Sequence, residues 1–253
     1  GRGTATFMVA GKACTRGCRF CAVDTIRNPP PPDEDEPIKL AEAIKNMGLT
    51  YSVITVVNRD DMDDGGALHY KKCIDKVHEI CPKVGIEFLC SDLSGNVNAL
   101  EFLLDNSPLT VFAHNVETVR RLTPRVRDPR ATFDQSLLIL KKAKDFRPDI
   151  ITKTSIMLGL GETEDDLLSA FRELRDAKVD LLTLGQYLSP GPRYHPVVSF
   201  PSPETFDSLA QIAKEMGFKA IASGPMVRSS YRAESLVAAA KGETFDIELK
   251  VVA

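Results

Sequence analysis

The stretch that decides the fold lies near the start of the chain, where Thr4-Ala5-Thr6-Phe7-Met8-Val9-Ala10 leads into Cys14-Thr15-Arg16-Gly17-Cys18-Arg19-Phe20-Cys21. The first segment has the length and apolar content of a buried strand. The second places three cysteines at C-x3-C-x2-C spacing. Three closely spaced thiolates on one loop can hold a [4Fe–4S] cluster, with Gly17 allowing the turn. One iron then stays open to a substrate or cofactor, as one position does in a catalytic zinc site.

A zinc site or a disulfide fits the three cysteines less well. A structural zinc site uses four ligands, usually as two separated pairs, and no second close Cys/His pair follows. A disulfide between such near neighbours is disfavoured, and nothing suggests secretion. The remaining cysteines, Cys73, Cys81 and Cys90, are spaced too widely for a second cluster and are expected to be buried apolar residues.

Length and composition favour an enzyme without nucleic-acid or membrane partners. The chain has 253 residues and a net charge of -3, with both signs mixed along it. Apolar runs are shorter than a membrane span, and no signal or transit peptide is visible from Gly1, although the chain does not begin with Met. We expect one domain over residues 1–253, with a core at about 4–223 and a C-terminal tail at 224–253. A cytoplasmic location is expected, or the mitochondrial matrix or plastid if the source is eukaryotic.

Strand-like and helix-like segments alternate. The predicted strands are Thr4–Ala10, Tyr51–Val57, Ile86–Cys90, Leu109–Asn115, Ile151–Leu158 and Leu181–Gln186. Apolar stripes at helical spacing lie between them, at Ile38, Ala41 and Ile44, at Leu167, Phe171 and Leu174, and at Phe206, Leu209, Ile212 and Met216. This alternation predicts an α/β fold, a partial (β/α)6 barrel with a C-terminal extension.

Polar and glycine-bearing segments follow the predicted strands, where barrel enzymes place their active sites. Asn115 and Glu117 occupy alternate positions and are suited to paired hydrogen bonds with a ribose. Gly159 and Gly161 are equally consistent with backbone approach to an adenine and with an ordinary turn before a capped helix.

Charged side chains elsewhere are less specific. The loop from Arg125 to Arg130 could hold a cofactor carboxylate or an acidic protein, and a solvated loop is an equal alternative. For His69, His78 and His195 we expect solvent or backbone partners, and His114 is expected to orient its neighbours. No pair of histidines has metal-ligand spacing.

The ordered set of motifs resembles the lipoyl synthase family of the radical S-adenosylmethionine (SAM) superfamily over nearly the whole chain. Besides residues 3–8 and the cysteine loop, it comprises Arg59-Asp60-Asp61, Phe112-Ala113-His114-Asn115-Val116-Glu117-Thr118, Val126-Arg127-Asp128-Pro129-Arg130-Ala131, Gly159-Leu160-Gly161-Glu162-Thr163, Leu184-Gly185-Gln186-Tyr187-Leu188, Ala222-Ser223-Gly224-Pro225 and Val227-Arg228-Ser229-Ser230-Tyr231-Arg232-Ala233.

The resemblance implies a sulfurtransferase. A reduced [4Fe–4S] cluster on Cys14, Cys18 and Cys21 would cleave SAM, and the 5′-deoxyadenosyl radical would remove hydrogens from an octanoyl chain linked to a lysine of a carrier protein. Sulfur from a sacrificed auxiliary [4Fe–4S] cluster would then enter at C6 and C8. The carrier would be a lipoyl domain of a dehydrogenase E2 subunit or the glycine cleavage H protein. Ferredoxin or flavodoxin would supply electrons.

The resemblance also implies roles for particular residues. Ser230, more than Ser229, would ligate the auxiliary cluster. The residues that would bind SAM are Phe20, Asn58, Asn115, Glu117, Arg130, Lys153, Gly159, Gly161 and Gln186.

The chain departs from the family pattern in several places. The auxiliary-cluster motif C-x4-C-x5-C is expected upstream of Gly1, so the chain as given should form 5′-deoxyadenosine but no lipoyl product. Asn58 replaces the usual Asp, and the segments 91–96 and 190–195 match only in part. A related enzyme that abstracts hydrogen without inserting sulfur is the main alternative, followed by a non-catalytic metal-binding module.

Overall fold

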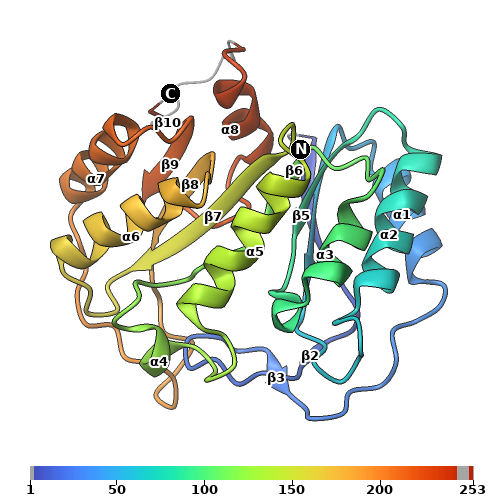
Figure 1. Ribbon diagram of the computed structural model, residues 1–253, viewed down its shortest axis with the longest axis horizontal. Coiled ribbons are helices and arrows are strands. Elements are labelled where there is room, and N and C mark those ends of the chain that lie inside the picture. Colours follow the sequence, from blue (N-terminus) through green and yellow to red (C-terminus); the bar gives the residue numbers. More distant parts are fainter. Residues whose placement is uncertain (1–2, 244–250, 253) are drawn as a thin grey trace.

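The structure, a computed structural model, describes residues 3–243 and 251–252. An eight-stranded sheet of order β1-β4-β5-β6-β7-β8-β9-β10 organises it (Figure 1). The first seven strands in this order are parallel, and β10 (Val251–Val252) pairs antiparallel with β9 (Ala220–Gly224). Among the described residues no pairing joins β1 to β10, so the sheet stays open. The predicted α/β class with a parallel sheet is confirmed.

All six predicted strands are present, and their ends differ from the predictions by no more than two residues. They are β1 (Thr4–Val9), β4 (Tyr51–Val56), β5 (Gly85–Leu89), β6 (Val111–Ala113), β7 (Ile151–Leu158) and β8 (Leu181–Gln186). Two short strands of the cysteine loop, β2 (Ala13–Cys14) and β3 (Asp24–Thr25), pair with each other. The predicted number of parallel strands is too small, because β9 was missed. Its small residues lack the apolar run that marks the other strands.

Helices follow most strands and pack against the sheet (Figure 1). They are α1 (Glu36–Asn46), α2 (Ala67–Ile80), α3 (Val97–Leu104), α4 (Thr123–Val126), α5 (Phe133–Phe146), α6 (Glu164–Asp176), α7 (Pro203–Glu215) and α8 (Ala233–Ala240), with a 3₁₀ turn at Leu93–Gly95. The capping box predicted for α6 is present, because Thr163 and Asp166 each accept the other's backbone N–H.

The predicted apolar stripe is confirmed on α6, where Leu167, Phe171 and Leu174 are buried. On α7 it is confirmed in part, because Phe206 and Leu209 are buried, whereas Ile212 is only partly buried and Met216 follows the last residue of the helix. On α1, Ile38 is exposed and Leu40 takes its place beside Ala41 and Ile44. The stripe moves because Pro37, at the start of the helix, is itself buried.

The inner side of the sheet is closed at one end by α8. Leu236 and Val237 of this helix belong to an apolar cluster that includes Tyr51, Val53 and Val111 on the amino-terminal halves of the strands. The opposite end, where the strands finish, carries the cysteine loop with β2 and β3, seen at the bottom of Figure 1 beside α4. This end is therefore the one left open for a functional site.

Candidate active site

The three cysteines of the loop converge on one cavity. Cys14, Cys18 and Cys21 are half-buried free thiols that line a cavity of about 250 Å³, here called the triad cavity. Backbone N–H groups point at the sulfurs: Arg16 and Asn58 donate to Cys14 Sγ, both at 3.4 Å, and Asp128 donates to Cys18 Sγ at 3.3 Å. Such donors stabilise thiolates, whereas burial raises the pKa of Cys18 to about 11 and also raises that of Cys21.

Arg16 anchors this loop from inside. Its side chain is 1% exposed, and it pairs with Asp60 (Nη2–Oδ1, 2.7 Å) and Asp92 (Nη1–Oδ2, 2.5 Å). Asp60 also accepts the Thr15 hydroxyl at 2.7 Å, which ties the loop to the segment after β4. Asp92 belongs to the segment 91–96, which only partly follows the family pattern, and Ser94 there adopts φ +52°. The loop is therefore held by buried charge pairs formed across the chain.

A second cavity, of about 320 Å³, adjoins the first and is here called the inner cavity. Phe20, Leu89, Asn115 and Glu117 line both. The other residues of the inner cavity are Ser155, Met157, Gly185, Gln186, Tyr187, Leu188, Val227, Arg228 and Ser229. The cysteine loop and the strand ends thus surround one continuous region, as expected from the barrel arrangement.

Five of the residues predicted to bind SAM line these cavities: Phe20, Asn58, Asn115, Glu117 and Gln186. Asn115 Nδ2 donates to Glu117 Oε1 at 3.2 Å. Both residues follow β6, which ends at Ala113, so strand alternation does not apply to them. Glu117 is held at φ +67° because its N–H donates to Ser155 O and its carbonyl accepts from Met157 N. Burial raises the pKa of Glu117. Backbone pairing with β7, and not strand alternation, therefore places this carboxyl group.

Lys153 lines neither cavity. Its ammonium group is 1% exposed and bonds Glu87 Oε1 at 2.7 Å, deeper inside the sheet. Glu87 also accepts the Tyr51 hydroxyl at 3.3 Å. A SAM-binding role for Lys153 has no support in this geometry, since its ammonium group is already paired with the buried carboxylate of Glu87.

The glycine turn and Arg130 also lie outside the cavity linings. The N–H of Gly159 donates to Glu162 at 2.6 Å and its carbonyl accepts from Val198 at 2.8 Å, so its polar groups are used. Gly161 lies against the Val198 side chain. Arg130 is half-exposed and pairs with Asp128 and Asp60 behind the cysteine loop. Of the two C-terminal serines, Ser229 lines the inner cavity and Ser230 does not.

Arg127 reaches the triad cavity instead of Arg130. It is 7% exposed, and its Nη1 donates to Ser136 Oγ at 2.7 Å. Among the described residues its Nε has no hydrogen-bond partner, so one buried donor is available at the triad cavity. The spacing of the arginines in this loop does not indicate whether Arg127 or Arg130 reaches the cavity. Ser155 was also missed, although it lies two residues after Lys153 on the same face of β7.

His114 is buried between these groups and is neutral. Its Nδ1 lies 3.0 Å from the Cys90 carbonyl, so Nδ1 donates and Nε2 accepts from Ser136 Oγ at 2.9 Å. Burial, and then the charge of Arg127, lowers its pKa to about 4. The orienting role expected for His114 agrees with these contacts, because the ring links Cys90, the residue after β5, to Ser136 of α5.

The depressed pKa of His114 predicts a pH-dependent stability. The unfolded ring titrates near pH 6.5, so we expect the contribution of the neutral ring to be complete above about pH 6.5 and to be lost toward pH 4, by up to roughly 3 kcal/mol. His114→Gln should flatten this slope. Urea unfolding at several pH values measures it, and equal slopes for both proteins would refute the assignment.

The donor set of the triad cavity suits a [4Fe–4S] cluster. Three free thiols share one cavity, sulfur-directed N–H groups surround them, and an unpartnered guanidinium Nε lies nearby. Cys73, Cys81 and Cys90 are buried as predicted, and all three belong to one apolar cluster that also contains residues of the strands and helices. In the described part of the chain no helix is long and apolar enough to cross a membrane.

Comparisons with known proteins agree with this geometry. The chain is 53% identical to the apicoplast lipoyl synthase of Toxoplasma gondii over 91% of its length, 53% identical to the chloroplastic enzyme of Arabidopsis thaliana over 93%, and 52% identical to the mitochondrial enzyme of Homo sapiens over 91%. It spans 42%, 60% and 62% of those proteins. The resemblance to lipoyl synthases is therefore confirmed.

Solved structures support the fold. The FeFe-hydrogenase maturase HydG of Carboxydothermus hydrogenoformans superposes with a TM-score of 0.67 at 14% identity, covering 93% of this chain and 56% of that one. Methylornithine synthase (PylB) gives 0.65 at 14% identity, covering 98% and 73%. The model of the radical SAM superfamily matches residues 8–174. This chain belongs to the radical SAM superfamily.

Proposed function

We propose that the protein is a lipoyl synthase, which inserts two sulfur atoms into a carrier-bound octanoyl group. One observation carries the proposal: a cavity with three convergent thiols, Asn115 and Glu117 occurs in a chain more than half identical to lipoyl synthases over nine-tenths of its length. The hydrogen-abstracting alternative without sulfur insertion has no comparable support among these relatives.

Cys14, Cys18 and Cys21 would hold the [4Fe–4S] cluster through their thiolates. With SAM bound, such a cluster would supply the radical chemistry. The protein would position the substrate and exclude water from the site. Asn115 and Glu117 present an amide and a carboxyl group for hydrogen bonds to SAM, and Phe20 offers its ring at the junction of the two cavities. The free Nε of Arg127 can donate to an anionic group in the triad cavity.

The inner cavity suits the acyl chain. Leu89, Met157 and Val227 line it, and apolar side chains of this kind would keep water away from the reacting carbons. Ser229 borders it and Ser230 follows directly, so either serine is a candidate ligand of an auxiliary [4Fe–4S] cluster at its mouth.

The macromolecular partners follow from the same proposal. The substrate would be an octanoylated lipoyl domain of a dehydrogenase E2 subunit or the glycine cleavage H protein, and ferredoxin or flavodoxin would be the reductant. The organellar enzymes among the relatives favour a mitochondrial matrix or plastid location over the cytoplasm.

Anaerobic turnover tests the proposal. The natural full-length protein, loaded with iron and sulfide, is mixed with SAM, a reductant and an octanoylated H protein, and the carrier lysine is analysed by mass spectrometry. Lipoyl-lysine together with 5′-deoxyadenosine is expected. The adenosine product without sulfur insertion would favour the alternative enzyme, and neither product would favour a metal-binding module.

A further inference from the structure

A second set of metal-ligand side chains lies outside the active site. Glu36, His69 and Cys73 place one carboxylate oxygen, one imidazole nitrogen and one sulfur within 4.8 Å of one another. His69 Nε2 lies 2.5 Å from Glu36 Oε2 and 3.7 Å from Cys73 Sγ. None of the three residues lines the triad cavity or the inner cavity.

The fold holds these groups together from two helices. His69 and Cys73 stand four residues apart on α2 and therefore share one face of that helix. Glu36 is the first residue of α1, and its Oε2 also accepts the backbone N–H of Ala10 at 2.8 Å. The side chains of His69 and Glu36 are 11% and 22% exposed, and Cys73 is fully buried. The donors are thus fixed in place and largely shielded from water.

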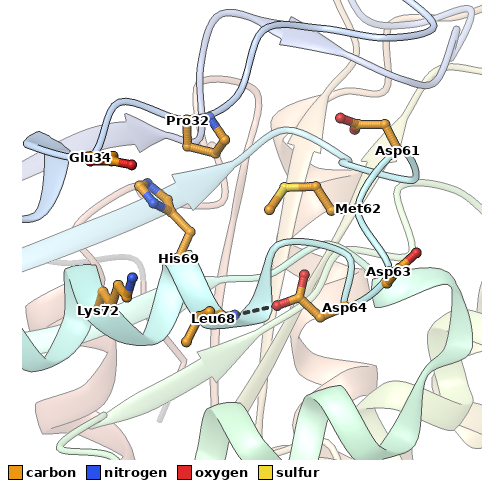
Figure 2. A pocket seen from close by; sticks show the side chains of 9 residues that line it. All are labelled: Pro32, Glu34, Asp61, Met62, Asp63, Asp64, Leu68, His69 and Lys72. Atoms are coloured by element: carbon orange, nitrogen blue, oxygen red, sulfur yellow. Dashed lines mark hydrogen bonds between the residues drawn. The ribbon is translucent and has the colours of Figure 1, made fainter.

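A pocket of about 820 Å³ opens beside His69 (Figure 2). Four carboxylate residues line it, together with a single lysine, Lys72: they are Glu34, Asp61, Asp63 and Asp64. Figure 2 shows the His69 ring between the segment that carries Pro32 and Glu34 and the helix that carries Leu68 and Lys72. An acid-rich pocket raises the local concentration of cations, and it gives a bound ion room for a water ligand.

We propose that Glu36, His69 and Cys73 form a binding site for Zn²⁺ or a similar divalent cation, separate from the iron–sulfur site. One thiolate, one imidazole and one carboxylate are ligands that zinc accepts, and a water from the pocket would complete a tetrahedron. Tetrahedral bond lengths place a sulfur and a nitrogen ligand about 3.6 Å apart, close to the 3.7 Å observed for Cys73 and His69.

Binding requires two local changes. The Glu36 oxygen and the His69 nitrogen must separate from 2.5 Å to about 3.3 Å as the metal ion binds between them, and the neutral imidazole must then carry its hydrogen on Nδ1 so that Nε2 can bind the ion. Cys73 must release its thiol proton to solvent as the sulfur–metal bond forms. The ion would then join α1 and α2 next to Ala10, which precedes the cysteine loop.

Metal content of the cluster-loaded protein tests the site. Protein with its iron–sulfur site filled is incubated with Zn²⁺, desalted, and measured for zinc, iron and thermal unfolding. We expect one zinc per chain with unchanged iron, and a higher unfolding temperature. Glu36→Gln, His69→Gln and Cys73→Ser should each lose the zinc and the temperature shift. Cys81→Ser is the matched control, since Cys81 follows the same helix outside the donor set, and it should keep both.

The zinc K-edge spectrum separates this site from the other cysteines. One sulfur and otherwise nitrogen or oxygen ligands are expected. Equal zinc in the wild-type protein and in His69→Gln would overturn the proposal, as would three sulfur ligands, which would place the ion on the loop cysteines. The unfolding temperature measured without zinc shows whether each variant is folded, so His69→Gln provides the comparison even if Cys73→Ser is unstable. No readout uses lipoyl formation, so this test is independent of the proposed function.

Discussion

Replacing Cys18 with alanine is expected to reduce 5′-deoxyadenosine formation to background. Cys18 is one of the three thiols on the triad cavity, and the backbone N–H of Asp128 is directed at its sulfur. Two remaining thiolates leave a second iron without a protein ligand, so SAM has no unique open position. The reconstituted variant should also lose most of its iron and its broad absorbance near ~400 nm.

A control variant separates chemistry from folding. Cys81→Ala removes a buried free thiol from the apolar cluster that contains Cys73 and Cys90 and should retain iron and SAM cleavage. Both variants are assayed anaerobically by chromatography of the nucleoside product. Unchanged 5′-deoxyadenosine production by Cys18→Ala would remove this residue from the site.

Replacing Asp92 with asparagine should destabilise the protein by about 3 kcal/mol, the low end of the cost of breaking a buried ion pair. Its carboxylate is fully buried against Arg16, which after the change keeps Asp60 as its one charged partner among the residues that the structure describes. Arg16 lies between Cys14 and Cys18, so its displacement should also lower the iron bound per chain. Urea unfolding and iron analysis measure the two effects.

The exposed pair of Lys39 and Asp33 provides the comparison. Its side chains are 60% and 55% exposed, and Asp33→Asn should leave both unfolding and iron content unchanged, because solvent screens such pairs. If Asp92→Asn behaves like Asp33→Asn, the buried pairs of Arg16 do not hold the cysteine loop.

Local pattern was sufficient for most of the fold. The apolar runs located six strands to within two residues, and helical spacing located the buried faces of α6 and α7. Periodicity failed where side chains are small, at β9, and where a buried proline shifts the stripe, at α1. It succeeded elsewhere because strands covered on both faces must be apolar throughout.

Within the site, the depth of a side chain along its strand was harder to predict than the face of the sheet on which it lies. Lys153 and Ser155 lie on the same face of β7, yet Ser155 lines the inner cavity and Lys153 is buried against Glu87. Alternation indicates the face of a residue but not its depth. Arg127 and Arg130 lie in one loop, where no period exists to indicate which of them reaches the triad cavity.

The amino-acid sequence by itself determined the cysteine loop and the parallel strands, because both depend on neighbours within a few residues. Only the tertiary structure decided that Arg16 meets Asp60 and Asp92, and that Glu36 meets His69 and Cys73. These contacts join segments more than thirty positions apart, except for the single helical turn between His69 and Cys73. Packing of helices on the sheet brings such groups together. The spacing of residues along the chain does not predict these contacts.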